Sequence, residues 1–579
     1  MAVLAPWLAW LVISLLSLYL LNLLAHARSG LPPGPRPLPL IGSLHLLGDK
    51  PHRSLAHLAK IHGPLMSVRL GAVTTVVVSS PAMARKFLQR HDSVLATRSV
   101  PDATGKHAAG VAWLPPGPRW RALRKIMATE LFAPHRLDAL HHLRSDKVRV
   151  LTDHVARLAR EGMAVNVGRV AFTTSLNLIS RTIFSIDLTS LDDHGRSEDF
   201  QQVITAMMEG LGTPNVACAG AWRGSLRARL AREGMAVNVG RVAFTTSLNL
   251  ISRTIFSIDL TSLDDHGRSE DFQQVIPAMM ECLGPPNVSD FFPVLAPADL
   301  QGMRRRLARI FARLHAVFDA EVDQRLRGRD AGQPRKNDYL DVLLDVAARD
   351  DGKDLLDRDT LRSQFTDLFA AGSDTSSSTV EWAMAELLRN PSSMAKVCDD
   401  LAQVIGSRRN IEEADIVRLP YLQAVIKETF RLHPPAPLLL PRQPEMTVKI
   451  AGYTIPKGSR VFINVWAIGR DKDVWKEPEK FMPERFLGSA IDFKGVDFEL
   501  LPFGAGRRIC PGMALAIRMV HVMLASMLNQ FNWSLPIELE RNGIDMEDQF
   551  GLTLVKAVPL YAMATPIRGK EKEPFLRVV

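Results

Sequence analysis

Apolar residues recur every three or four positions along most of the chain. Over residues 80–91, 304–326 and 513–531 this spacing puts the apolar side chains on one helix face and predicts amphipathic helices. Short β-branched runs at 65–80 and 447–464 are interrupted by Gly or Pro, which predicts short strands joined by turns. The pattern therefore predicts a mainly α fold with small β-sheets.

The first residues follow a different pattern. From Trp7 to Leu24 the chain is apolar and uncharged, close to the roughly 20 residues that span a bilayer as a helix. A cleaved signal peptide is the alternative, because "AHA" at 25–27 resembles a cleavage site. However, the apolar run exceeds the usual length of about 7 to 15 residues, and no Lys or Arg precedes it. We expect residues 1–27 to be an uncleaved anchor, with the rest of the chain in the cytosol because the first basic residues follow the apolar run.

A proline-rich stretch follows the anchor. Residues 28–42 contain "PPGPRPLPLIG", and proline fixes φ and removes backbone donors. This composition predicts a stiff hinge between the membrane and a body that spans residues 43–579.

The body contains a near-identical internal repeat. Residues 156–216 return as residues 228–288, an offset of 72 (228 − 156). The two copies differ only at the pairs Thr205/Pro277, Gly210/Cys282 and Thr213/Pro285. Solenoids need at least about three units and tolerate drift between them, so the repeat indicates a recent duplication or a gene-model error. Removing one copy leaves 507 residues (579 − 72).

Composition and charge narrow the possible classes of protein. The chain is 46% hydrophobic and 23% charged, as in a folded protein. Its four cysteines are too few and too scattered to form a disulfide framework, which favours a reducing compartment. The net charge of +10 suits an acidic partner, but no clustered basic arm is present, so nucleic acid is not expected.

One cysteine lies in a distinctive loop, "LPFGAGRRICPG", at 501–512. The loop has the form Phe-x-x-Gly-x-Arg-x-Cys-x-Gly with Cys510 as its thiol. A zinc site would need further Cys or His nearby, and "GAGRRI" lacks the third glycine of a dinucleotide fingerprint. The pattern favours a single axial thiolate on haem iron, with Arg508 as a cation for a haem propionate. The absence of Cys-x-x-Cys-His argues against covalently attached haem.

A second motif, "AAGSDTSSSTVEW", completes a resemblance to the cytochrome P450 superfamily of haem-thiolate monooxygenases. Ala371, Gly372, Asp374 and Thr375 match the family pattern in the helix that crosses the distal haem face. Read alone, the stretch could also be a helix N-cap rich in Ser and Thr. The resemblance extends from the anchor to about residue 565. It implies the P450 fold with an N-terminal transmembrane anchor helix, and a hydroxyl and a carboxylate that relay protons, with Thr375 bonded to the carbonyl of Ala371.

The resemblance also assigns roles to other residues. Glu428 and Arg431 in "KETFRLHPP" and Arg485 in "FMPERF" are expected to form a buried structural network behind the cysteine loop. The residues expected around haem b, besides Cys510, are Trp120, Arg124, Arg442, Arg508, Phe503, Gly504, Gly512, Ala371 and Gly372. The residues expected in the substrate pocket are Phe365, Leu368, Ala371, Leu439 and Leu552.

These motifs imply a single-pass endoplasmic reticulum monooxygenase that inserts one oxygen atom of O2 into a lipophilic small molecule. Electrons are expected from NADPH through a separate flavoprotein reductase, because the chain has no flavin or nicotinamide fingerprint. Details such as "GPRPLPLIGSLHLLGDKPHRSLAHLAKIHGPLMSVRLG" resemble the plant microsomal branch of geraniol and terpenoid hydroxylases, which implies a mono- or diterpenoid substrate. The alternatives are a flavonoid 3′-hydroxylase-like enzyme, a haem-thiolate isomerase or dehydratase, and an isoform made inactive by its duplicated segment, which resembles the substrate lid.

Overall fold

The helices and strands predicted from the apolar pattern are present in the computed structural model, with small shifts at their ends. The structure describes residues 30–139, 141–167, 287–335, 338–349, 355–406 and 410–567. The predicted anchor and most of both repeat copies lie outside the described residues, so those expectations stay predictions.

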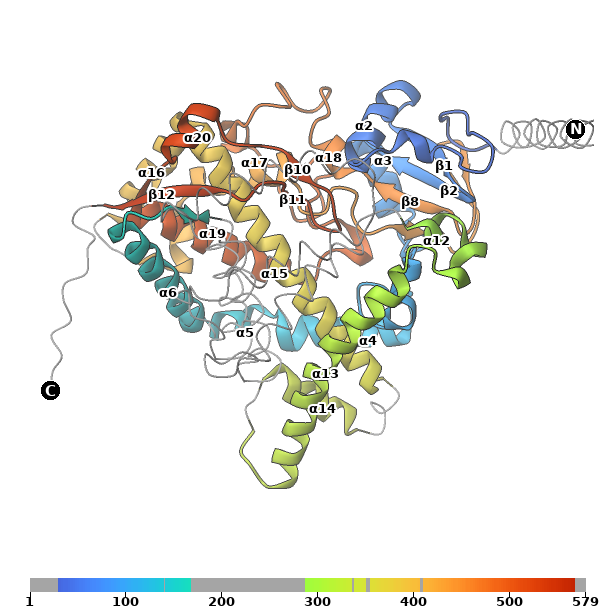
Figure 1. Cartoon of the computed structure of the whole chain (residues 1–579), viewed down its shortest axis with the longest axis horizontal. Helices are drawn as coiled ribbons and strands as arrows, with labels where there is room; N and C mark the ends of the chain where they lie inside the picture. Colours follow the sequence, from blue (N-terminus) through green and yellow to red (C-terminus); the bar gives the residue numbers. More distant parts are fainter. Residues whose placement is uncertain are drawn as a thin grey trace, which may run out of the picture.

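The α-helices dominate the described part of the chain (Figure 1). In chain order they are α2 (Pro51–His62), α3 (Pro81–Arg85), α4 (Pro118–Ile126), α5 (Pro134–Ala139), α6 (His141–Arg160), α12 (Val288–Phe291), α13 (Met303–Asp330), α14 (Tyr339–Ala347), α15 (Arg358–Arg389), α16 (Pro391–Ile405), α17 (Pro420–Leu432), α18 (Val465–Ile468), α19 (Met513–Gln530) and α20 (Ile537–Asn542). Shorter 3-10 and π turns are η1 (Leu44–Leu46), η2 (Lys86–Arg90), η3 (Asp102–His107), η4 (Met127–Leu131), η5 (Pro293–Ala298), η6 (Glu413–Arg418), η7 (Pro483–Phe486) and η8 (Gly506–Arg508).

Helix ends follow local sequence signals. The predicted helix at 80–91 forms as α3, and its last turn widens into the π turn η2. Ser80 caps α3 by accepting a hydrogen bond from the backbone N–H of Met83 at 3.4 Å, and Pro81 occupies the first turn, where its missing N–H costs nothing. The predicted helices at 304–326 and 513–531 are confirmed as α13 and α19.

The strands form small sheets, as predicted. They are β1 (Leu65–Leu70), β2 (Val73–Val78), β3 (Thr97–Arg98), β4 (Val165–Asn166), β5 (Arg442–Gln443), β6 (Val448–Ile450), β7 (Tyr453–Ile455), β8 (Arg460–Ile463), β9 (Phe531–Ser534), β10 (Asp548–Gln549), β11 (Val555–Lys556) and β12 (Tyr561–Pro566). The largest sheet has the order β1-β2-β8-β5-β3, with an antiparallel β1–β2 hairpin and a parallel β2–β8 pair. In this sheet Arg98 and Arg442 are cross-strand partners, so two arginines far apart in sequence lie side by side.

The long helix α15 crosses the middle of the molecule (Figure 1) and packs against α13, α17 and α19. Asp357 caps the start of the helix, because its carboxylate accepts the N–H of Thr360 at 2.7 Å. Within the described ranges, α19 is the one helix long and apolar enough to span a bilayer, but 72% of it is buried inside the protein. We therefore interpret α19 as a core helix that carries the cysteine loop at its start.

Candidate active site

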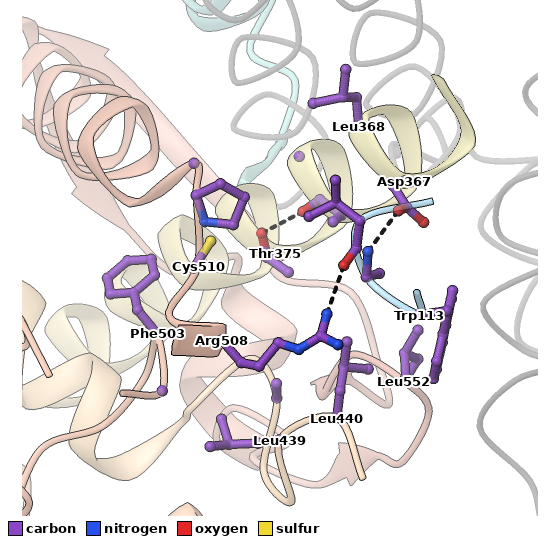
Figure 2. Close-up of a pocket in the computed structure, with 18 of the residues that line it drawn as sticks. Trp113, Asp367, Leu368, Thr375, Leu439, Leu440, Phe503, Arg508, Cys510 and Leu552 are labelled. Carbon is purple, nitrogen blue, oxygen red and sulfur yellow. Dashed lines mark hydrogen bonds between the residues drawn. The ribbon is translucent and has the colours of Figure 1, made fainter. Parts of the chain in front are cut away.

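A cavity of about 340 Å³ lies between α15, α4 and the cysteine loop. Figure 2 shows Cys510, Phe503 and Thr375 toward one side of it and Asp367 and Trp113 toward the other. Its lining is mostly apolar, so the polar groups that reach it stand out.

Cys510 reaches the cavity from the loop that precedes α19. Its N–H donates to the carbonyl of Phe503 at 3.0 Å, which closes the loop on itself. Gly506 has φ of 68°, and a Cβ there would lie 2.4 Å from the carbonyl oxygen of Leu88, so no larger residue fits. The loop is therefore held rigidly against the η2 turn.

Burial raises the pKa of the Cys510 thiol above its usual value. The backbone N–H groups of Gly512 and Met513 at the start of α19 and the charge of Arg124 act in the opposite direction. Burial is the largest effect, so the surrounding protein favours the neutral form of the thiol. A bound cation would favour the thiolate.

Four arginines line the same cavity: Arg98 on β3, Arg124 on α4, Arg442 on β5 and Arg508 on η8. Arg442 pairs with Asp92 at 3.0 Å. The other three donate to carbonyl oxygens and have no carboxylate within ion-pair distance in the part of the chain that is described. Arg508, for example, donates to the carbonyls of Ala96, at 2.6 Å, and Val111, at 3.1 Å, and Figure 2 shows its guanidinium beside the cavity.

The net positive charge of this arginine cluster favours the binding of an anion. Burial and the neighbouring arginines hold the pKa of Arg98 well below its ordinary value, and its Nε is buried without a hydrogen-bond partner. Burial also lowers the pKa of Arg508 to about 10. Such uncompensated cations are costly unless an anion binds them. Haem carries two propionate carboxylates, so the arginines present fit that group.

Arg98 is a residue that the sequence analysis did not identify. It belongs to no motif, and its partnership with Arg442 arises only through the β3–β5 pairing. Trp120 was identified, and its Nε1–H donates to the carbonyl of Val111 at 3.2 Å while its ring lies 4.6 Å from the guanidinium carbon of Arg508. The ring thus packs against an arginine side chain at the cavity wall.

On the opposite wall, α15 presents Ala371, Gly372 and Thr375 to the cavity. The Thr375 hydroxyl donates to the carbonyl of Ala371 at 2.8 Å, as the sequence predicted. Thr379 makes the same bond to the carbonyl of Thr375, also at 2.8 Å. The bond to Ala371 fixes the Thr375 hydroxyl beside the cavity, and the bond from Thr379 occupies the carbonyl of Thr375.

Asp374 precedes Thr375 in the chain but does not itself line the cavity; its carboxyl bonds to Thr553, which does. Burial raises the pKa of Asp374 to about 6, and the bond from Thr553 opposes the shift. About two helical turns further on, burial raises the pKa of Glu381 to about 7, and Asp374 adds to the increase. These carboxyls can hold or release a proton near neutral pH.

The predicted substrate residues divide into two groups. Leu368, Ala371, Leu439 and Leu552 line the cavity. The prediction for Phe365 is wrong: its side chain is fully buried and packs edge-to-face on Phe318 of α13, with ring centroids 5.5 Å apart. Resemblance placed the residue on the right turn of α15, but the helix phase turns its ring into the core. The cavity is instead lined by Thr366 and Asp367.

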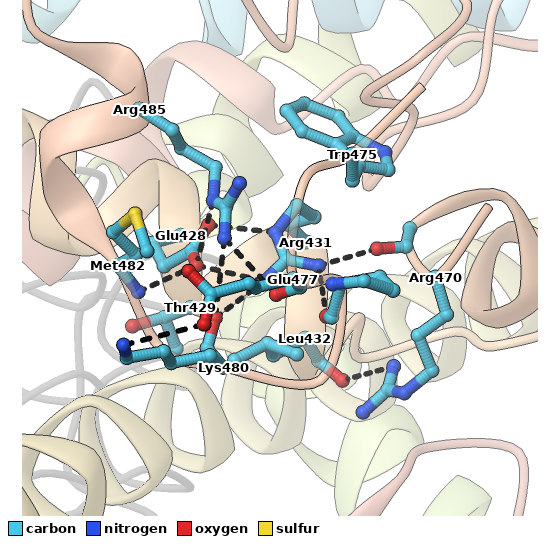
Figure 3. Close-up of polar contacts among 12 residues, drawn as sticks. Glu428, Thr429, Arg431, Leu432, Arg470, Trp475, Glu477, Lys480, Met482 and Arg485 are labelled. Carbon is cyan, nitrogen blue, oxygen red and sulfur yellow. Dashed lines mark hydrogen bonds and ion pairs between the residues drawn. The ribbon is translucent and has the colours of Figure 1, made fainter. Parts of the chain in front are cut away.

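Glu428, Arg431 and Arg485 form a buried network (Figure 3). Arg431 donates two bonds to Glu428, both at 2.7 Å, and Arg485 donates to it at 3.0 Å. Arg431 also donates to the carbonyls of Gly469, at 2.5 Å, and Pro478, at 2.6 Å. One carboxylate therefore serves both arginines, and their other donors reach backbone carbonyls, so the buried charges are well hydrogen-bonded.

The network reaches the cysteine loop through aromatic rings that the sequence analysis did not identify as a group. Phe430, beside Arg431 on α17, packs edge-to-face on Phe503 with centroids 5.4 Å apart. Phe493 contacts both rings, at 6.0 Å and 5.8 Å. Because the network fixes the end of α17, it also fixes the ring that supports the loop.

A lone, half-buried thiol in a rigid glycine-rich loop, facing a cavity lined by arginines, is the arrangement of a haem-thiolate enzyme. Comparison with known proteins agrees. The sequence model of the family "Cytochrome P450" matches residues 32–222 and 224–559, with one copy of the internal repeat in each match. The chain belongs to the cytochrome P450 family. It is therefore a monooxygenase with haem iron as cofactor and electrons from a redox partner.

Several similar proteins are plant enzymes. The chain is 43% identical to geraniol 8-hydroxylase of Swertia mussotii over 550 residues, which cover 94% of this chain and 96% of that protein. It is 43% identical to geraniol 8-hydroxylase of Catharanthus roseus over 547 residues, again 94% and 96% of the two chains. It is 39% identical to geranylhydroquinone 3″-hydroxylase of Arnebia euchroma over 558 residues, 96% and 98% of the two chains.

Proposed function

We propose that this protein hydroxylates a terpenoid with electrons delivered from NADPH by a flavoprotein reductase. The observation that carries the proposal is the 43% identity to geraniol 8-hydroxylases along 94% of the chain. The cavity supports it, because Leu368, Leu439 and Leu552 give it an aliphatic wall suited to a hydrocarbon skeleton. A single-pass anchor in the endoplasmic reticulum, with the catalytic body in the cytosol, belongs to the same proposal.

We assign the haem contacts as follows. Cys510 ligates the iron. Arg98, Arg124, Arg442 and Arg508 hold the propionates. Trp120 supports Arg124 and Arg508, whose guanidinium carbons lie 5.9 Å and 4.6 Å from its ring. Phe503, Gly504 and Gly512 lie on the cysteine side, whereas Ala371 and Gly372 of α15 lie on the other. When bound, haem supplies O2 activation, so that one oxygen atom enters a C–H bond and the other becomes water.

The chain's own residues control protons and water. Thr375 holds its hydroxyl at a fixed place because the carbonyl of Ala371 accepts from it. Asp374, with its pKa raised to about 6, can exchange a proton with Thr553 at the cavity wall. We therefore assign Thr375 and Asp374 as the groups that deliver protons to the oxygen side of the cavity. The apolar lining excludes water from the remainder of the cavity.

The test is turnover by the full chain in microsomes with an NADPH-dependent flavoprotein reductase. Geraniol, a diterpene and a flavonoid are compared, with products identified by the gain of one oxygen. Hydroxylation of a terpenoid is expected. Hydroxylation of the flavonoid alone would refute the terpenoid assignment.

A variant with a single copy of the repeat tests whether the duplication affects haem binding and turnover. Deleting residues 156–227 leaves one copy of the repeat. Equal haem content and turnover in both proteins would show that the duplication is tolerated. Haem binding by the deletion variant alone would show that the longer chain is an inactive isoform.

A further inference from the structure

The cavity carries polar groups on the side away from Cys510, where the haem contacts do not need them. Thr104 and Thr366 line it, but their hydroxyls already donate to the carbonyls of Pro101, at 2.6 Å, and Arg362, at 2.8 Å. Asp367 is different, because its carboxyl is only partly satisfied by the protein.

The Asp367 carboxyl is fixed by the segment that covers it. Its Oδ2 accepts the backbone N–H of Ala112 at 2.9 Å, and Figure 2 shows this bond beside Trp113. A Cβ at Gly110 would lie 2.1 Å from Oδ2, so the backbone approaches the carboxyl as closely as only glycine allows. Among the described residues, Oδ1 has no hydrogen-bond partner. One oxygen is thus used by the fold, and the other is available to a ligand.

Asp367 lies on the same face of α15 as Thr375, whose hydroxyl we assign to proton delivery. Asp367, Ala371 and Thr375 are four residues apart on α15, and all three line the cavity. Eight residues of helix correspond to a rise of about 12 Å. A hydrogen bond takes about 3 Å of that distance, which leaves about 9 Å, or roughly seven to eight bonds of an extended chain. The residue between the two polar groups is alanine, which leaves room for a ligand along this face.

We propose that Oδ1 of Asp367 accepts a hydrogen bond from a hydroxyl group of the substrate and so selects the carbon that lies beside Thr375. The substrate class is an extended terpenoid alcohol whose hydroxyl is roughly seven to eight bonds from the oxidised carbon. The inference rests on the proposed function and deepens it. Geraniol has this form, with its hydroxyl and carbon 8 at opposite ends of an extended chain.

The first test needs no variant. Binding of geraniol, its methyl ether and the corresponding hydrocarbon to the full-length holoenzyme is measured by substrate-induced spectral shifts. Measurements are made at about pH 8, because burial raises the pKa of Asp367 to about 7 and the carboxylate is then ionised. The alcohol can donate to Oδ1 and the ether cannot, so the alcohol should bind about 10- to 100-fold more tightly. Equal affinity for alcohol and ether would overturn the proposal.

The second test is the Asp367→Asn variant. The amide oxygen can still accept from Ala112 while its NH2 group faces the cavity, so an acceptor for the substrate becomes a donor. The preference for alcohol over ether should fall below about threefold, and hydroxylation should spread over several carbons. Asp359→Asn changes an exposed carboxylate on the same helix, paired with Arg362, and should leave the preference unchanged. An unchanged preference and regioselectivity in Asp367→Asn would overturn the proposal. Failure of the intact holoenzyme to bind or oxidise any of the three compounds would instead overturn the proposed terpenoid function, and the role of Asp367 with it.

Discussion

Replacing Arg98 with methionine tests whether the arginine cluster holds haem. In the protein alone, Arg98 is buried beside Arg442 and Arg508, its Nε has no partner, and its clear bond is from Nη1 to the carbonyl of Leu440 at 2.7 Å. Methionine removes the buried charge and fills similar space. The haem-free chain should therefore be as stable as the wild type or more stable.

The effect on the holoenzyme should have the opposite sign. A hydrogen bond to a charged group contributes about 1.5–3 kcal/mol, so losing one propionate contact should speed haem loss about 10- to 100-fold. Haem transfer to excess apomyoglobin measures this rate, with the exposed Arg121→Met on the same helix as Arg124 for comparison. A haem-loss rate equal to that of the wild type would refute the role assigned to Arg98.

Three further outcomes are expected. Thr375→Ala removes the hydroxyl bonded to Ala371 and should lower product formation at least about tenfold, with Thr375→Ser restoring most of it; equal loss in both variants would argue against proton delivery. Arg431→Met leaves Glu428 and several carbonyls short of donors and should cost about 3–5 kcal/mol, seen as a lower urea midpoint and lower haem content. Burial in an aromatic cluster lowers the pKa of His315 to about 4. The unfolded chain therefore binds a proton more readily, and the free energy of unfolding should fall as pH drops from about 6.5 to about 4. Denaturation curves of His315→Phe should show a decrease that is smaller by about 3 kcal/mol.

The site residues that the sequence analysis identified belong to short motifs. The cysteine loop, the α15 motif and the Glu428–Arg431 pair each place their residues through a local turn or helix spacing, so a contiguous stretch of sequence is enough to identify them. The bond from Thr375 to Ala371 follows from helix geometry alone and is confirmed.

The site residues that the sequence analysis did not identify are brought together only by tertiary structure. Arg98 joins the cluster because β3 pairs with β5. Phe430, Phe493 and Phe503 meet from three separate segments. In the sequence Asp367 is an ordinary polar position of a helix, and only the tertiary structure places the backbone of Gly110 and Ala112 against its carboxyl. For Phe365 the helix was predicted correctly, but the phase that turns its ring toward Phe318 depends on how α13 packs.

The central claim is that Cys510 is the thiolate ligand of a bound haem, and the absorption spectrum of the reduced protein with carbon monoxide tests it most directly. We expect the wild type to show the red-shifted Soret band of thiolate-ligated haem, and Cys510→Ser to lack it while keeping the same fold by circular dichroism. The same band in Cys510→Ser, or its absence in wild-type protein that contains haem, would contradict the claim.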